Sequence, residues 1–306
     1  MKKILLISIM FFLTPVSSVT PYLELNAEAY HGGYYYDVSC NNNIVFTACD
    51  DDGLRAYLFS EDKLILLDTI DNGGLYRGVF YKNKNNIIYT ACGYRGVRAY
   101  SFKENKLHLT AESKDGTDFY NKVFVDDNYV YVACVNSLKV YTKTLTLLDS
   151  YPIRCLDIWS KNQRVYIASG SEGLNVLYFD GRQLYFQYNI NDGRYYLGIY
   201  GDDDGIYCAC STDGLVMYTP EGVRHRYDGG VYHDVYTDAK YIYASCGKKG
   251  LKVYTKTLYL VAEAYDGGIY WASISNSSHI STACDNNGLR VYILKNIINP
   301  YSISKL

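Results

Sequence analysis

Nine cysteines in this chain of 306 residues are candidates for disulfides or metal binding. In an exported protein such a number suggests disulfides. Six of them occupy one place in a repeated motif: Cys49, Cys92, Cys134, Cys210, Cys246 and Cys284. On a ring with a radius of roughly 10 Å, seven equivalent positions lie about 9 Å apart, beyond the ~7 Å Cα limit for a disulfide. We therefore predict buried free thiols and no metal ring, and leave open a local disulfide among Cys40, Cys155 and Cys208.

Acidic clusters and histidines are the other candidate metal ligands. Clusters at 49–53, 126–127 and 201–205 offer the oxygen ligands that Ca²⁺ prefers. They occupy different turns and contain no Asp-x-Asp-x-Asp-Gly…Glu loop, so aspartate and glycine as turn formers explain them more simply. The five histidines show no HExxH or paired spacing, and the sequence contains no Gly-x-Ser-x-Gly elbow. We predict no metal, no cofactor and no catalytic residue.

Two motifs alternate seven times along the chain, with a period of 35 to 43 residues. The first motif is "DGGVYHDV" at 228–235, and its other copies lie at 31–38, 72–79, 115–123, 151–158, 192–199 and 266–273. The second motif is "IYASCGKKGLKVY" at 242–254, and its other copies lie at 45–57, 88–100, 130–141, 165–177, 206–218 and 280–292. Such regular repetition indicates an architecture in which each copy forms one structural unit.

Each unit predicts four short strands. The residues after Gly-Gly form the first strand, "IYTAC" the second, "GLRVY" the third, and a run such as 63–70 the fourth. Glycine and aspartate mark the turns, where positive φ is needed. Four strands per period of about 40 residues are typical of a β-propeller blade. The sequence therefore predicts an all-β protein, a seven-bladed β-propeller of four-stranded antiparallel blades.

The N-terminal segment predicts how the ring closes. Residues 22–30, "YLELNAEAY", match 258–265, "LYLVAEAY", which form a fourth strand. We therefore expect this N-terminal strand to complete the last blade beside residues 288–293 and to remove an open edge. The predicted organisation is a signal peptide at 1–18, the propeller at 19–295 and a C-terminal tail at 296–306.

The alternating units resemble those of the LVIVD-repeat family of β-propellers, and the resemblance covers residues 22–293. Gly-Leu in the third strand and Tyr-x-Ala in the second recur in most copies. The match is divergent, because tyrosine takes the place of the family's aspartate at the end of the third strand, as in Tyr57 and Tyr292. The resemblance implies an exported propeller and brings no assigned activity.

One column of the first motif has the composition of a binding site. The residue type at this position varies between the seven copies, whereas the adjacent positions keep similar residues. The first strand of a blade lies innermost in a propeller. Residues at its start therefore surround the mouth of the central channel, where loops on a rigid scaffold commonly bind partners. The predicted binding residues are Tyr36, Arg77, Asn121, Asp157, His233, Asp234 and Trp271. The alternative is sequence drift at positions that face a wet channel.

The N-terminus and the charge balance indicate where the protein acts. Lys2 and Lys3 precede the apolar run 4–13 and a segment of small residues, the order of a secretory signal peptide. We expect a secreted or cell-surface protein with no membrane insertion after signal cleavage. A net charge of −2 with mixed signs argues against a nucleic-acid partner.

These observations favour an exported, non-catalytic propeller. We predict a monomer that binds a protein, peptide or glycan at the channel mouth. Two alternatives stay open. One is a propeller hydrolase of the lactonase type, in which Asp37, Asp157, Asp234 and His233 supply acid–base groups. The other is a structural component of the cell surface, which self-association would reveal.

Overall fold

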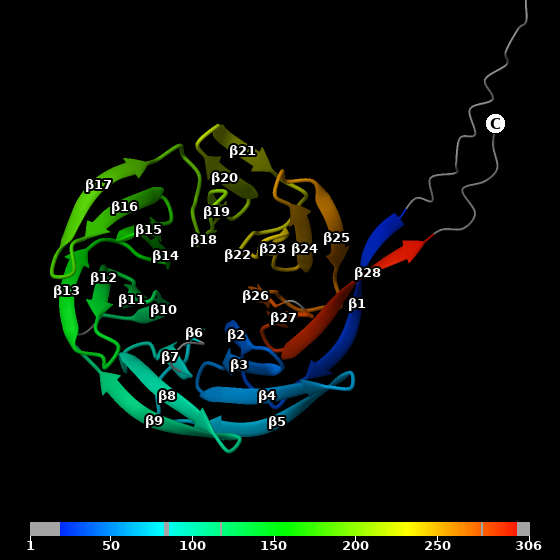
Figure 1. The fold of residues 1–306 in the computed structure, drawn as a ribbon, viewed down its shortest axis with the longest axis horizontal. Coiled ribbons are helices and arrows are strands. Elements are labelled where there is room, and N and C mark those ends of the chain that lie inside the picture. Colours follow the sequence, from blue (N-terminus) through cyan, green and yellow to red (C-terminus); the bar gives the residue numbers. More distant parts are fainter. Residues whose placement is uncertain (1–18, 83–85, 117, 277, 299–306) are drawn as a thin grey trace, which may run out of the picture.

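Seven four-stranded antiparallel sheets are arranged around a central axis in the computed structural model (Figure 1). The structure describes residues 19–82, 86–116, 118–276 and 278–298. The predicted signal peptide, residues 1–18, lies outside the described residues. The all-β, seven-bladed β-propeller predicted from the repeats is confirmed, and the described residues form no helix.

The strands of each blade follow one another from the axis outward, and are called here the inner, second, third and outer strands. Blade 1 consists of β2 (Asp37–Asn41), β3 (Ile44–Ala48), β4 (Leu54–Ser60) and β5 (Lys63–Ile70). Blade 2 consists of β6 (Gly78–Lys82), β7 (Ile87–Ala91), β8 (Val97–Lys103) and β9 (Lys106–Ser113). Blade 3 consists of β10 (Tyr120–Val125), β11 (Val130–Cys134), β12 (Ser137–Tyr141) and β13 (Leu147–Pro152).

The remaining blades have the same order. Blade 4 consists of β14 (Asp157–Lys161), β15 (Arg164–Ala168), β16 (Leu174–Phe179) and β17 (Leu184–Ile190). Blade 5 consists of β18 (Gly198–Gly201), β19 (Ile206–Ala209), β20 (Leu215–Thr219) and β21 (Gly222–Arg226). Blade 6 consists of β22 (Asp234–Thr237), β23 (Tyr241–Ser245), β24 (Leu251–Thr255) and β25 (Leu260–Ala264). Blade 7 consists of β26 (Ala272–Ser275), β27 (Ile280–Ala283), β28 (Leu289–Ile298) and β1 (Val19–Ala29).

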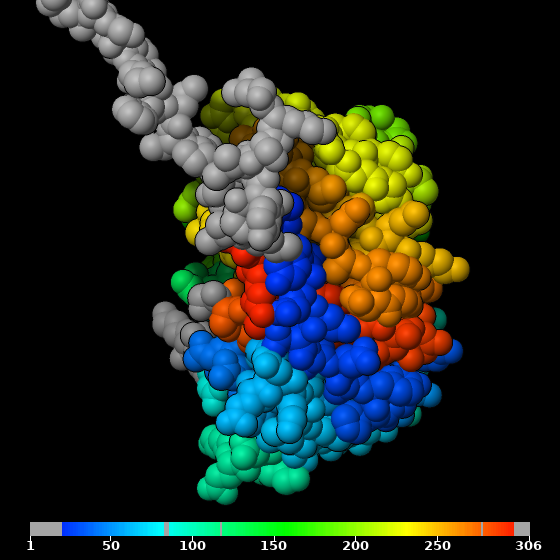
Figure 2. Space-filling model, turned by 90° about the vertical axis from the view of Figure 1, so that its right-hand side faces the viewer, coloured from blue at the N-terminus to red at the C-terminus, as the bar shows by residue number. Residues whose placement is uncertain are grey.

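Blade 7 joins the two ends of the chain, as the sequence predicts. Strand β1 pairs antiparallel with β28, from Val19 opposite Ile298 to Ala29 opposite Leu289. Figure 2 shows β1, in dark blue, at the outer surface beside the red residues of β28. Because β1 is the outer strand of the last blade, this pairing ties the first described residues to the last and leaves no third-strand edge open.

The two repeated motifs form a single packing unit within each blade. In blade 2, the Tyr76 hydroxyl of the first motif lies 2.9 Å from the Tyr100 hydroxyl of the second. The Arg98 guanidinium donates to the Gly73 carbonyl at 2.6 Å and to the Tyr76 hydroxyl at 3.0 Å. Both tyrosines are fully buried. The Gly-Gly turn, at φ +75° and +108° in blade 2, is therefore held by the arginine of the third strand.

Among the described residues, a backbone bridge joins neighbouring blades at the start of six inner strands. Tyr76 of blade 2 and Asp50 of blade 1 exchange two backbone hydrogen bonds, at 3.0 and 2.8 Å. The same bridge joins Tyr35 of blade 1 to Asp285 of blade 7, which closes the ring. The six cysteines of the repeated position are buried, and all nine cysteines are free. The prediction of buried, unbridged thiols is confirmed for the six repeated positions.

Candidate functional site

The innermost positions of the seven blades form a charged layer across the channel. Each of these residues is paired with the same position of the second strand, and they are Asp37, Gly78, Lys122, Asp157, Gly198, Asp234 and Ala272. The Lys122 ammonium of blade 3 reaches across the axis to Asp37 Oδ1 of blade 1 at 2.8 Å. Asp234 Oδ2 of blade 6 lies 3.7 Å from the same nitrogen. The carboxyl groups of Asp37 and Asp234 thus share one cation. Asp37 and Asp157 are 5 % and 7 % exposed.

Two of these aspartates also join neighbouring blades. Asp37 Oδ2 accepts a hydrogen bond from the Val79 backbone N–H at 2.9 Å, and Asp157 Oδ2 accepts one from Ile199 at 2.8 Å. An inner strand has a free edge, so these carboxylates satisfy N–H groups that no strand pairs. Glycine follows each such aspartate in the ring. A Cβ on Gly198 would lie 2.8 Å from the Asp234 Cα, which explains why no side chain is present there.

The buried carboxyl groups bind protons more tightly than usual. Removal from water raises the pKa of Asp157 to about 7, against the opposing charge of Lys122. The same cause raises the pKa of Asp234 to about 6. Burial alone would lower the pKa of Lys122, but the carboxylates of Asp234, Asp37 and Asp157 raise it above its ordinary value. The layer therefore keeps its ammonium charged and can take up protons near neutral pH.

Four of the predicted binding residues lie in a row at the start of the inner strands, next to the charged layer. The Arg77 guanidinium of blade 2 lies 4.0 Å from the centre of the Tyr36 ring and forms an ion pair with Asp50 at 3.0 Å. The Tyr36 ring lies 5.6 Å from the Trp271 ring, which lies 4.3 Å from the His233 ring. The row therefore runs through blades 2, 1, 7 and 6, and each side chain in it is half-buried.

Two members of this row have unusual polar groups. Burial lowers the pKa of His233 to about 4, so its imidazole is neutral at pH 7. The indole N–H of Trp271 is buried and has no hydrogen-bond partner among the described residues. A buried indole N–H ordinarily has one. The mouth therefore offers a cation and aromatic rings on one continuous surface, whereas the unpaired indole N–H of Trp271 is buried.

The three other predicted binding residues, Asp157, Asp234 and Asn121, lie in or beside the charged layer. Asp157 and Asp234 lie in the charged layer rather than at the mouth. Asn121 is half-buried beside it, at a bulge where the register of β10 and β11 shifts between Tyr120 and Lys122. Lys122 follows Tyr120 by two residues, as Asp37 follows Tyr35, so it has in blade 3 the position that Asp37 has in blade 1. Sequence reasoning missed Lys122 as a site residue, although its place directly after Asn121 in the first motif was the signal that could have identified it.

At the opposite end of the inner strands the channel wall is aromatic. A cavity of about 650 Å³ is lined by Phe80, Tyr200 and Tyr236, among others. The Tyr200 and Tyr236 rings lie 4.8 Å apart, and the Phe80 and Phe124 rings lie 5.1 Å apart. The charged layer thus separates an aromatic cavity from the mouth. Within the described residues, no three metal-ligating side chains come together.

Comparisons with known proteins support the fold alone. No family model and no curated protein matches the sequence. The structure is similar to the crystal structure of the computationally designed Ika8 protein, with a TM-score of 0.64. The sequence identity is 10 %, and the comparison covers 88 % of this chain and 99 % of that chain. The chain is therefore an all-β, seven-bladed β-propeller, a fold that carries many unrelated functions. The described residues include no helix that is long and apolar enough to cross a membrane.

Proposed function

We propose that this protein is an exported, non-catalytic β-propeller that binds a protein, peptide or glycan at the mouth of its central channel. The row of Arg77, Tyr36, Trp271 and His233 carries the proposal, because four blades contribute to one half-buried surface of aromatic and polar groups. Aromatic rings and arginine are the side chains that contribute most to binding energy at interfaces. The N-terminal sequence of charged, apolar and small residues supports export to the cell surface or beyond.

We also propose that this protein is a divergent member of the LVIVD-repeat family of propellers. The alternating motifs and the closure by β1 support descent from an LVIVD-repeat propeller, with tyrosine in place of the usual aspartate at the end of the third strand. In this protein that tyrosine bonds the tyrosine of the first motif, as Tyr100 bonds Tyr76. The substitution therefore has a packing reason within each blade. We further propose that the partner is not a nucleic acid, since the net charge is −2.

A binding experiment with two matched triple variants tests this function. The purified protein would capture partners from its native surroundings, and mass spectrometry would identify them. In the test variant Arg77, His233 and Trp271 are replaced by alanine. In the control Tyr185, Phe186 and Tyr188, exposed on the outer strand β17, are replaced instead. We expect the first variant to bind the identified partner at least ten-fold more weakly and the control to bind normally. Unchanged binding by a folded test variant would rule out the mouth as the site.

The raised pKa values of Asp157 and Asp234 favour one second candidate, acid–base catalysis within the channel. A carboxyl group that titrates near pH 7 can act as a general acid or base. This candidate predicts turnover of lactones or glycosides by the wild type and its loss in Asp157→Asn. Absence of turnover across both substrate classes would leave binding as the function.

A further inference from the structure

The turn between the third and outer strands of blade 6 places a lysine against blade 5. The Lys256 ammonium contacts Asp202 Oδ2 of blade 5 and the Thr237 hydroxyl. The same nitrogen lies 5.1 Å from the centre of the Tyr207 ring. Asp202 also accepts hydrogen bonds from the backbone of its own turn, at 2.8 Å from Asp204 and 3.2 Å from Gly205. This arrangement is a complete ammonium site: a carboxylate, a hydroxyl and an aromatic ring.

Blade 6 repeats the carboxylate and the ring of this site. Asp238 Oδ1 accepts hydrogen bonds from the backbone N–H groups of Lys240 and Tyr241, both at 2.8 Å. The Tyr243 hydroxyl donates to Asp238 Oδ2 at 2.7 Å. Asp238 and Tyr243 therefore stand in blade 6 where Asp202 and Tyr207 stand in blade 5.

The lysine is not repeated. Tyr254 and Tyr292 are equivalent, because their hydroxyls bond those of Tyr232 and Tyr270 at 2.8 and 2.5 Å. Two residues later, blade 6 has Lys256 and blade 7 has Leu294. Blade 7 also lacks the turn that carries the lysine, because its outer strand β1 comes from the other end of the chain.

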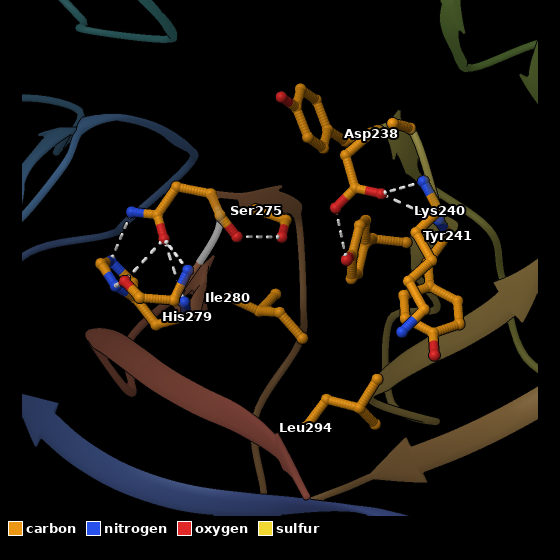
Figure 3. A pocket seen from close by; sticks show the side chains of 12 residues that line it. Asp238, Lys240, Tyr241, Ser275, His279, Ile280 and Leu294 are labelled. Atoms are coloured by element: carbon orange, nitrogen blue, oxygen red, sulfur yellow. Dashed lines mark hydrogen bonds between the residues drawn. The ribbon is translucent and has the colours of Figure 1, made fainter.

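A cavity of about 560 Å³ lies where this lysine would reach. Asp238, Tyr241 and Ile280 line it together with Leu294 (Figure 3). No ion pair joins Asp238 to a cationic side chain of the described residues; the Lys240 ammonium lies instead 4.9 Å from the Tyr241 ring centre. His279, which also lines the cavity, is buried and has a pKa lowered to about 4, so it adds no positive charge at pH 7.

We propose that this cavity between blades 6 and 7 binds a primary ammonium group on a short aliphatic stem. The ammonium takes beside Asp238 the place that Lys256 Nζ takes beside Asp202. The Tyr243 ring offers the same cation–π contact that Tyr207 offers Lys256. Ile280 and Leu294, which line the cavity, offer an apolar surface for the stem. The site is distinct from the channel mouth, and the proposal does not depend on the function proposed above.

Two sources can supply this chemistry, a free alkylamine or a lysine side chain, including Lys305 of this chain, which lies outside the described residues. The probe is n-butylammonium, titrated at pH 7 into the protein and followed by calorimetry and by NMR shifts of aromatic resonances. The neutral n-butanol is the matched control ligand. We expect saturable binding of the amine at least ten-fold tighter than that of the alcohol. Equal binding of the two ligands would overturn the proposal.

A reciprocal exchange of the two equivalent residues makes the test specific. Leu294→Lys should fill the cavity with its own ammonium and weaken n-butylammonium binding at least ten-fold. Lys256→Leu should instead create a second amine site beside Asp202. Lys240→Gln, which removes a competing ammonium from the lining of the cavity, should tighten binding. Unaltered binding in a folded Leu294→Lys variant would overturn the proposal.

A final variant separates the two sources. If Lys305 occupies the site, wild-type protein binds n-butylammonium weakly and Lys305→Gln binds it at least ten-fold more tightly. If the site takes an external amine, the two proteins bind it equally. Absence of binding in both proteins would overturn the proposal.

Discussion

The hydroxyls of Tyr232 and Tyr254 lie 2.8 Å apart in a site where both side chains are fully buried. The equivalent tyrosines are bonded in six of the seven blades. Blade 4 has Cys155 and Leu177 in their places, and both are fully buried. Blade 4 therefore lacks both tyrosine hydroxyls. Losing both together leaves no single buried hydroxyl without its partner.

Removing one hydroxyl of this pair should therefore destabilise the protein. We expect Tyr254→Phe to lower the free energy of unfolding by about 1 kcal/mol, because the Tyr232 hydroxyl loses one of two buried partners and keeps only the Asp228 backbone N–H. Urea denaturation measures the change. Tyr259→Phe is the control, since Tyr259 is 70 % exposed and should have no effect. Equal stability of the two variants would show that the pair contributes nothing.

The charged layer predicts that stability decreases as the pH rises toward neutrality. The folded-state pKa of Asp157 is raised to about 7, so between about pH 4 and pH 7 the folded protein binds more protons than the unfolded chain. The free energy of unfolding should therefore fall across this window, by at most about 1.4 kcal/mol per pH unit for one group. Asp157→Asn should reduce this slope. A slope identical to that of the wild type would contradict the raised pKa.

Lys122 should matter most where the carboxyl groups are ionised. Removing one partner of a buried ion pair typically costs about 3–5 kcal/mol, because the remaining charge is left uncompensated. We expect Lys122→Met to approach this loss at pH 8 and to lose clearly less at pH 5, where Asp157 and Asp234 bind protons. Denaturation at both pH values gives the comparison, with the exposed Lys240→Met as control. If Lys122→Met lost the same free energy of unfolding at both pH values, the packing of the Lys122 side chain, and not its charge, would explain its contribution to stability.

The arginine of the third strand should not be replaceable by lysine. Arg98 donates to the carbonyls of Gly73 and Asn72 and to the Tyr76 hydroxyl. A lysine cannot reproduce this planar set of donors. We expect Arg98→Lys to lower the free energy of unfolding by about 2 kcal/mol, in line with the loss of one or two buried hydrogen bonds. Arg95→Lys in the neighbouring exposed turn is the control and should not change the free energy of unfolding. An equally small effect of Arg98→Lys would show that the hydrogen bonds of Arg98 do not stabilise the Gly-Gly turn.

Much of the fold could be predicted from the sequence because its determinants are local and repeated. Glycine turns, apolar strand residues and buried cysteines recur in most units, and the match of 22–30 to 258–265 indicates how β1 closes the ring. The mouth residues Tyr36, Arg77, His233 and Trp271 could also be identified, because residues at the same position of successive repeats lie on a circle around the propeller axis. What these residues bind remains a proposal.

Only the tertiary structure decided which side chains meet across the axis or between blades. Lys122 reaches Asp37, 85 positions earlier in the chain, because both residues lie at the innermost positions of their blades, around the same axis. The difference between Lys256 and Leu294 becomes informative only when Asp202 and Asp238 are seen on the adjoining blades. Repeat periodicity determines the position of a residue within its own blade. Contacts between blades depend on how seven sheets close around one axis. The distance between residues of different blades is set by the packing of the whole ring.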